Sequence, residues 1–156
     1  MTAPAPIPFG TPAWATALRD ALNRSSEYRN AAAKWGVGFN GALLLAFEAD
    51  ATLASPIHLF LALASGRCDA AEFVSIRSDP RAGFTLRAPF TLWREILERR
   101  TMAAAAILTG KMHVDGEKMT LLRHAGASRA LIHVVASVPT LFPDAGAGTA
   151  PRPAAS

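Results

Sequence analysis

The side chains most able to do chemistry in this sequence are four histidines and one cysteine, and they are spread without a catalytic or metal-binding spacing. No two of His58, His113, His124 and His133 form the HxxxH pair of a helical zinc site. Cys68 has no histidine beside it in the sequence that would activate its thiol. The GxSxG nucleophile elbow is also absent. The sequence therefore predicts a protein that is not an enzyme and that uses no metal ion and no cofactor.

The distribution of charge argues against nucleic acid as a partner. The chain has 16 basic and 12 acidic residues, a formal charge of +4, and these residues are scattered singly. No run of five basic residues occurs, and glutamates interrupt even the densest cluster, at residues 94–100. Aromatic residues do not alternate with basic ones as a base-stacking surface requires. The excess of positive charge instead favours weak contact with an acidic membrane surface. It identifies no protein partner.

Length and hydropathy predict one domain with a tail at each end. The chain has 156 residues, of which 51% are hydrophobic and 18% charged, enough to bury a core. Residues 1–10 and 143–156 are rich in Pro, Gly and Ala, so we expect flexible tails around a domain at 11–142. The longest apolar stretches, at residues 41–47 and 57–64, are too short to span a membrane. Because the start also lacks a secretory signal, we expect a cytoplasmic protein.

The sequence predicts helices at the start of the chain and again in its second half, and these helices must help to position a binding site. Thr11 and Pro12 are suited to start a first helix, and Ser25 or Ser26 can cap a short second one. Thr101 can cap a third short helix in the second half of the chain. Helical spacing of apolar residues in that half predicts helices over residues 90–99, 102–108 and 117–138.

Between the two sets of helices the apolar residues alternate with a period of two, which indicates strands. We interpret four segments in this way, at residues 36–48, 57–63, 73–76 and 84–88. Ser65-Gly66 is a hairpin turn signal, and the short connections predict an antiparallel meander. A further short strand is predicted within residues 111–116. The order is helices, four strands, two helices, one strand and one helix, which predicts an α+β fold with helices covering a sheet.

A longer pattern of motifs occurs in residues 83–122. A strand, a helix with an aromatic face and a small-residue helix lead to the segment TGKMHVDG at 109–116, which is followed by Met119, Leu121 and Leu122. This order resembles the C-terminal half of the sterol carrier protein type 2 family, in which Gly-Lys-hydrophobic-x-Val/Ile-x-Gly precedes a Met/Leu-rich helix. The likeness covers about residues 12–138. The paired N-terminal helices resemble those of the bacterial members of the family.

The resemblance implies a five-stranded, mainly antiparallel sheet covered on one side by helices, with an apolar cavity between the layers. It implies that the cavity binds or transfers a lipid of the sterol, fatty acid or acyl-CoA type. Without the resemblance, the apolar stripes of the helices would be ordinary hydrophobic core. From the resemblance and the helix faces, the residues expected to line the cavity are Phe90, Trp93, Ile96, Leu97, Met102, Ala106, Ile107, Met112, Met119 and Leu122.

Two other functions remain open on the sequence alone. The chain can be an accessory module that holds a lipophilic intermediate, such as an isoprenoid quinone precursor, for partner enzymes. It can also be an enzyme acting on acyl thioesters, because some members of the family are fused to thiolase-like or dehydrogenase-like domains. An empty cavity of about 300 Å³ would cost about 7 kcal/mol. We therefore expect either a lipid retained through purification or a cavity that shrinks when empty.

Overall fold

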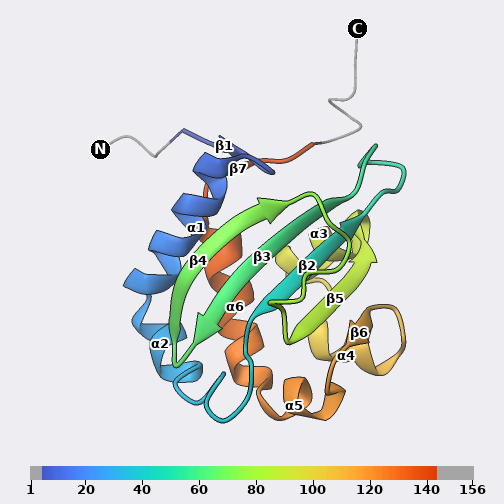
Figure 1. The fold of residues 1–156 in the computed structure, drawn as a ribbon. Coiled ribbons are helices and arrows are strands. Elements are labelled where there is room, and N and C mark those ends of the chain that lie inside the picture. Colours follow the sequence, from blue (N-terminus) through green and yellow to red (C-terminus); the bar gives the residue numbers. More distant parts are fainter. Residues whose placement is uncertain (1–4, 144–156) are drawn as a thin grey trace, which may run out of the picture.

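The computed structural model describes residues 5–143, and its centre is a five-stranded sheet with the strand order β4-β3-β2-β5-β6 (Figure 1). Neighbouring strands are antiparallel, except that β2 and β5 are parallel. The mainly antiparallel sheet agrees with the expectation, but the predicted meander is wrong because β5 lies beside β2. The strands are β2 (Leu43–Glu48), β3 (Ile57–Ala64), β4 (Arg67–Val74), β5 (Phe84–Pro89) and β6 (His113–Asp115).

The chain reaches β5 through a loop, residues 75–83, that crosses the outer face of the sheet, away from the helices (Figure 1). Ala82 of this loop packs on a small apolar cluster that includes Phe60. At the end of the loop, the N–H of Gly83 donates to the carbonyl of Ala42 (2.9 Å). A Cβ at position 83 would clash with the carbonyl oxygen of Asn40, so this close crossing requires glycine.

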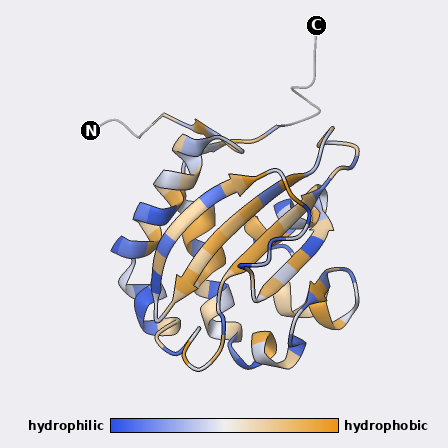
Figure 2. Cartoon of the chain, viewed as in Figure 1, coloured by the Kyte–Doolittle hydropathy of each residue, from blue (hydrophilic) through white to orange (hydrophobic). Residues whose placement is uncertain are grey.

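The residues that alternate with a period of two divide between the two faces of the central strands. Leu59, Leu61 and Leu63 of β3 all lie in the main core, and Figure 2 shows how hydrophobic β2 and β3 are. The strand predicted from residue 36 begins only at Leu43. Two glycines at residues 36 and 38 have φ values of 81° and 83° and turn the chain before it. Ile76 lies beyond the end of β4 and is exposed.

The helices cover the other, inner face of the sheet (Figure 1). Helix α1 packs along β4, α3 packs on β2 and β5, and α6 contacts α1, α2, α3 and α4. As predicted, Thr11 caps α1 by accepting from the N–H of Trp14, and Ser25 caps α2 by accepting from the N–H of Tyr28. The helices are α1 (Pro12–Arg24), α2 (Ser26–Ala31), α3 (Phe90–Leu97), α4 (Ala103–Leu108), α5 (Lys118–Arg123) and α6 (Ala125–Ser137).

Two details of the helices differ from the prediction. The single helix expected over residues 117–138 is divided at His124, whose φ of −108° and ψ of 36° interrupt it between α5 and α6. The His124 ring packs edge-on against Trp35 and Phe39, which holds the chain in this break. Thr101 does not cap α4, because its hydroxyl instead donates to a carboxylate oxygen of Glu95 (3.0 Å).

A second, two-stranded sheet joins the two ends of the described chain. β1 (Ile7–Pro8) pairs in parallel with β7 (Thr140–Leu141). Next to it, the Phe9 side chain is buried and meets Trp14 and Phe47 edge-on, with centroid distances of 4.9 Å and 5.0 Å. Residues 7–9 are thus packed, although their composition suggested a flexible tail. The remainder of the two predicted tails, at 1–4 and 144–156, lies outside the described residues.

Candidate binding cavity

A cavity of about 60 Å³ lies between the inner face of the sheet and the helices. Its floor is formed by alternate residues of the central strands, among them Leu43, Leu45 and Leu59. Its roof includes Leu131 and Val135, which are one helical turn apart on α6. The cavity therefore lies where the period-two pattern of the strands faces the helical stripe of α6.

Three tryptophans line this inner cavity, and each indole N–H is satisfied by an acceptor of the protein. The acceptors are the Thr140 hydroxyl for Trp14 (2.8 Å), the Gly41 carbonyl for Trp35 (2.8 Å) and the Ala46 carbonyl for Trp93 (3.0 Å). The rings therefore contribute hydrocarbon surface to the wall. Burial raises the pKa of the Tyr28 phenol, which also lines the cavity and stays protonated at neutral pH. The wall thus carries no charged side chain.

A second cavity, of about 200 Å³, lies next to the first among α4, α5, α6 and the end of α3. Five residues line both cavities, including Ile107, Leu121 and Ile132. The rim of this outer cavity includes the exposed residues Arg99 and Met102. The two cavities are therefore adjacent and share part of their lining, most of which is apolar.

Positive charge surrounds the outer cavity. Arg99 and Arg129 both line it, and no ion pair joins either to a carboxylate within residues 5–143. Arg99 has a φ of 63°, in the left-handed region that glycine adopts most readily. His133 also lines this cavity, and its Nδ1 lies 3.0 Å from a carboxylate oxygen of Glu27 on α2. The outer cavity therefore combines apolar walls with two unneutralised guanidinium groups.

The residues predicted to line a cavity are divided between the two spaces. Of the ten, Phe90 and Ala106 are buried but line neither cavity. Met102 and Met119, which we expected to point at the sheet, are 58% and 55% exposed because α4 and α5 present them outward. Met119 lines neither cavity. Trp93, Leu97, Ile107 and Met112 line the inner cavity, and Ile96, Met102, Ile107 and Leu122 line the outer one.

The sequence reasoning missed the floor of the cavity and the part of its wall that comes from the first half of the chain. A signal for the floor is present in the sequence, because leucines two residues apart, such as Leu43 and Leu45, share one face of a strand. Trp14, Tyr28 and Trp35, which lie in or just after the paired N-terminal helices, also line the cavity. What was missing was the fold that brings these residues opposite α3 and α6.

Two of the reactive side chains, Cys68 and His58, lie outside both cavities. Cys68 is buried, which raises the pKa of its thiol to about 12, and the thiol donates to the Ala70 carbonyl (3.3 Å). Burial, together with the nearby charge of Arg87, lowers the pKa of His58. Neither side chain lines a cavity. Within the described part of the chain, no three His, Cys, Asp or Glu residues gather as metal ligands, and no helix is long and apolar enough to cross a membrane.

Comparison with known proteins identifies the fold. No model of a protein family matches the sequence, and no curated protein does. Solved structures do match. A crystal structure of sterol carrier protein 2 has 32% sequence identity and a TM-score of 0.73, over 83% of this chain and 98% of that one. A solution structure of a conserved hypothetical protein from Thermus thermophilus, described as a possible sterol carrier protein, has 29% identity and a TM-score of 0.74, over 90% and 96%.

A third match shares the fold at much lower identity. Sterol carrier protein 2 from Yarrowia lipolytica, in its apo form, has 16% identity and a TM-score of 0.50, over 78% of this chain and 88% of that one. The matches confirm the resemblance carried by residues 83–122. With about a third of its residues identical to a sterol carrier protein 2 over almost the whole of that protein, and with the same fold, this chain belongs to the sterol carrier protein 2 family.

Proposed function

We propose that this protein binds a lipid with a long apolar chain in its inner cavity and carries it without changing it chemically. The observation that carries the proposal is the wall of that cavity, where leucines of the sheet face α6 and three tryptophans present only their rings. An apolar wall of this kind favours hydrocarbon, because each buried methylene contributes about 0.8 kcal/mol. Family membership supports the same conclusion.

The size of the inner cavity implies that it enlarges when the ligand enters. At about 60 Å³ it is well below the ~300 Å³ at the lower end of ligand sites. Left empty, it costs only about 1.4 kcal/mol, which agrees with a cavity that is small without its ligand. Ile107, Leu121 and Ile132 line both this cavity and the outer one. We infer that movement of these three side chains joins the two spaces into one site.

The rim of the outer cavity favours a ligand with an anionic end. Arg99 and Arg129 line this cavity without a carboxylate partner in residues 5–143. A carboxylate or phosphate placed there would gain charge-assisted hydrogen bonds, while its chain extended past Ile107 into the inner cavity. This arrangement favours a fatty acid or an acyl-CoA over a sterol, whose single hydroxyl carries no charge.

The test is to identify what the protein binds and to block the space that should hold it. Solvent extraction of the purified protein followed by mass spectrometry is expected to release a lipid. After delipidation, palmitate is expected to raise the melting temperature. The proposal fails if nothing is extracted and palmitate leaves the melting temperature unchanged.

A variant that fills the inner cavity sharpens this test. Ala127 lines the inner cavity, and Ala127→Val adds two methyl groups there. It is expected to reduce the palmitate-induced rise in melting temperature. Ala136→Val makes the same change at an exposed position of the same helix and should leave that rise intact.

The extracted ligand also separates this proposal from its rivals. An isoprenoid quinone precursor, in place of a fatty acid or acyl-CoA, would favour the accessory module for partner enzymes. Hydrolysis of an acyl-CoA by the purified protein would contradict a carrier without chemistry. We expect no hydrolysis, because the buried Cys68 thiol is held neutral and lies outside both cavities.

A further inference from the structure

The net positive charge of the chain is confined to one segment. Between Arg99 and Arg129 lie six of the 16 basic residues but only two of the 12 acidic ones. The ten basic and ten acidic residues elsewhere cancel. The segment forms α4, β6, α5 and the start of α6, which lie together at one end of the fold (Figure 1). A charge of +4 spread evenly over the whole chain would produce only a weak potential at any one place on the surface. The same charge at one end of the fold creates a local positive potential there.

The basic side chains of this end are available to a partner. Lys111, Lys118 and Arg123 are exposed and form no ion pair within residues 5–143. The two acidic residues of the segment are already engaged. Asp115 pairs with Arg87 on β5, and the carboxylate of Glu117 accepts the N–H of Thr120 as the cap of α5. Neither carboxylate forms an ion pair with Lys111, Lys118 or Arg123.

Large apolar side chains of the same segment are also exposed. Met102 is 58% exposed, Leu108 69% and Met119 55%, and they are three of the six exposed large hydrophobic residues in the described part of the chain. All three lie around the outer cavity. Met102 lines it, Leu108 is one helical turn beyond the lining residue Ala104, and Met119 is one turn before the lining residue Leu122.

We propose that these six residues form a docking face for an anionic phospholipid bilayer. The face consists of Lys111, Lys118 and Arg123 with Met102, Leu108 and Met119. Cations attract the anionic headgroups, while apolar side chains beside them insert among the upper acyl carbons, which is how interfacial segments bind membranes. That the outer cavity then opens toward the bilayer rests on the function proposed above, but the docking itself does not.

The first experiment measures co-sedimentation with vesicles of equal parts phosphatidylglycerol and phosphatidylcholine, and with vesicles of phosphatidylcholine alone. The protein is expected to bind the anionic vesicles more tightly, and added salt should weaken this binding. In the triple variant Lys111→Gln, Lys118→Gln, Arg123→Gln, each lost cation should weaken binding about fivefold, or about a hundredfold together. The matched control Lys34→Gln, Arg67→Gln, Arg77→Gln loses the same charge elsewhere and should change binding less than fivefold.

The second experiment tests the apolar half of the face at unchanged charge. Leu108→Ser with Met119→Ser is expected to weaken binding to the anionic vesicles about tenfold. Equal losses in the two triple variants would overturn the proposal, because attraction would then depend only on net charge. Absence of binding to anionic vesicles would also overturn it, and capture of an acidic protein by this face would then identify a protein partner instead.

A third measurement keeps this proposal distinct from the proposed function. None of the residues changed on the face lines either cavity, so the palmitate-induced rise in melting temperature should be preserved in both face variants. A variant that loses vesicle binding but keeps this rise supports docking by the face. If vesicle binding is lost only in variants that also lose this rise, the loss follows the fold or the cavity and the docking face is contradicted.

Discussion

The two faces of the central sheet bury similar side chains under different covers. On the inner face, leucines such as Leu45 and Leu59 lie under helices, and a cavity remains between them. On the outer face, Leu44 and Phe60 alternate with those leucines and are equally buried, but a loop lies directly over them. Burial of an apolar strand face therefore does not by itself create a ligand site. A site requires a cover that can stand away from the sheet, as a helix can.

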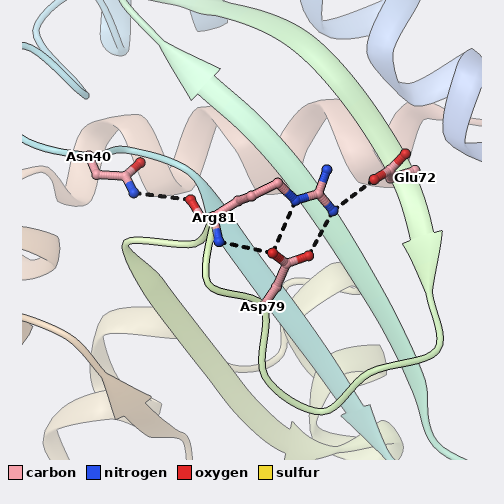
Figure 3. A network of polar contacts seen from close by, with 4 residues as sticks. All are labelled: Asn40, Glu72, Asp79 and Arg81. Atoms are coloured by element: carbon pink, nitrogen blue, oxygen red, sulfur yellow. Dashed lines mark hydrogen bonds and ion pairs between the residues drawn. The ribbon is translucent and has the colours of Figure 1, made fainter.

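Local polar contacts hold the outer cover close to the sheet. Arg81 donates to the Asp79 carboxylate at 2.7 Å and to that of Glu72 at 2.8 Å, while Asn40 donates to the Arg81 carbonyl (Figure 3). The guanidinium also lies 4.0 Å from the centroid of the Phe60 ring. These contacts tie the loop to three strands or their ends, so the outer face has a tight polar cover and the inner face an apolar one.

The largest expected effect comes from removing an aromatic residue from the inner face. Phe9 is buried among Trp14, Phe47 and Phe73. Phe9→Ala is expected to lower the free energy of unfolding by about 3–5 kcal/mol, because it leaves a cavity in this cluster. Urea denaturation measures this. A loss below ~1 kcal/mol would show that the segment around β1 does not contribute to the core.

A smaller loss, accompanied by a gain in ligand uptake, is expected at the wall between the cavities. Ile107→Ala should lower the free energy of unfolding by about 2–4 kcal/mol and join the two spaces. Stopped-flow fluorescence with a fluorescent fatty acid should then show faster uptake. Ile96→Ala is the control, because Ile96 is buried but lines only the outer cavity. Equal uptake rates in the two variants would contradict a wall at Ile107.

The stability contributed by the contacts on the outer face should depend on pH, unlike that contributed by the apolar packing on the inner face. The Arg81 guanidinium, which donates to Asp79, holds the pKa of that carboxyl below its ordinary value of 3.8. The stability from this contact is therefore present above about pH 4 and is lost as the pH falls through the lowered pKa. Asp79→Asn should lower the melting temperature at about pH 7, and the difference from the native protein should shrink toward about pH 2. A difference independent of pH would contradict this account.

The smallest expected effect is a gain at the rim of the outer cavity. Arg99 has a φ of 63°, so Arg99→Gly should relieve backbone strain and raise the free energy of unfolding by about 0.5–1 kcal/mol. Loss of the guanidinium should at the same time weaken the binding of palmitate, which isothermal titration calorimetry measures. Arg100→Gly serves as the control without a positive φ and should bring no gain in stability.

Much of the fold could be predicted from local pattern. The caps at Thr11 and Ser25 and the strands at residues 57–63 and 84–88 were predicted correctly because each depends on residues close in the sequence. The parallel pairing of β5 with β2 could not be predicted. It depends on the loop before Gly83 crossing a face already built by residues 43–64. The break at His124 similarly depends on Trp35, which is far away in the sequence.

Some residues of the candidate site could likewise be predicted from local spacing, and others could not. Trp93, Ile107 and Met112 could be chosen in advance because helical spacing and the motif around Gly110 mark them. Met119 is exposed and lines neither cavity, because spacing defines a helix face but not what that face meets. The floor of the cavity was missed for the same reason. A strand face is visible in the sequence, but the element opposite it is not.

By itself, the sequence determined most of the helices and strands, the resemblance to the family and the segment that carries the positive charge. These follow from neighbouring residues, whose spacing the backbone geometry converts directly into faces. Only the tertiary structure decided that one sheet face has a tight polar cover, that the other encloses a cavity, and that Arg99, Met102 and Arg129 line a second cavity beside it. Those features depend on which distant faces meet and how closely, and packing of the whole chain sets that distance.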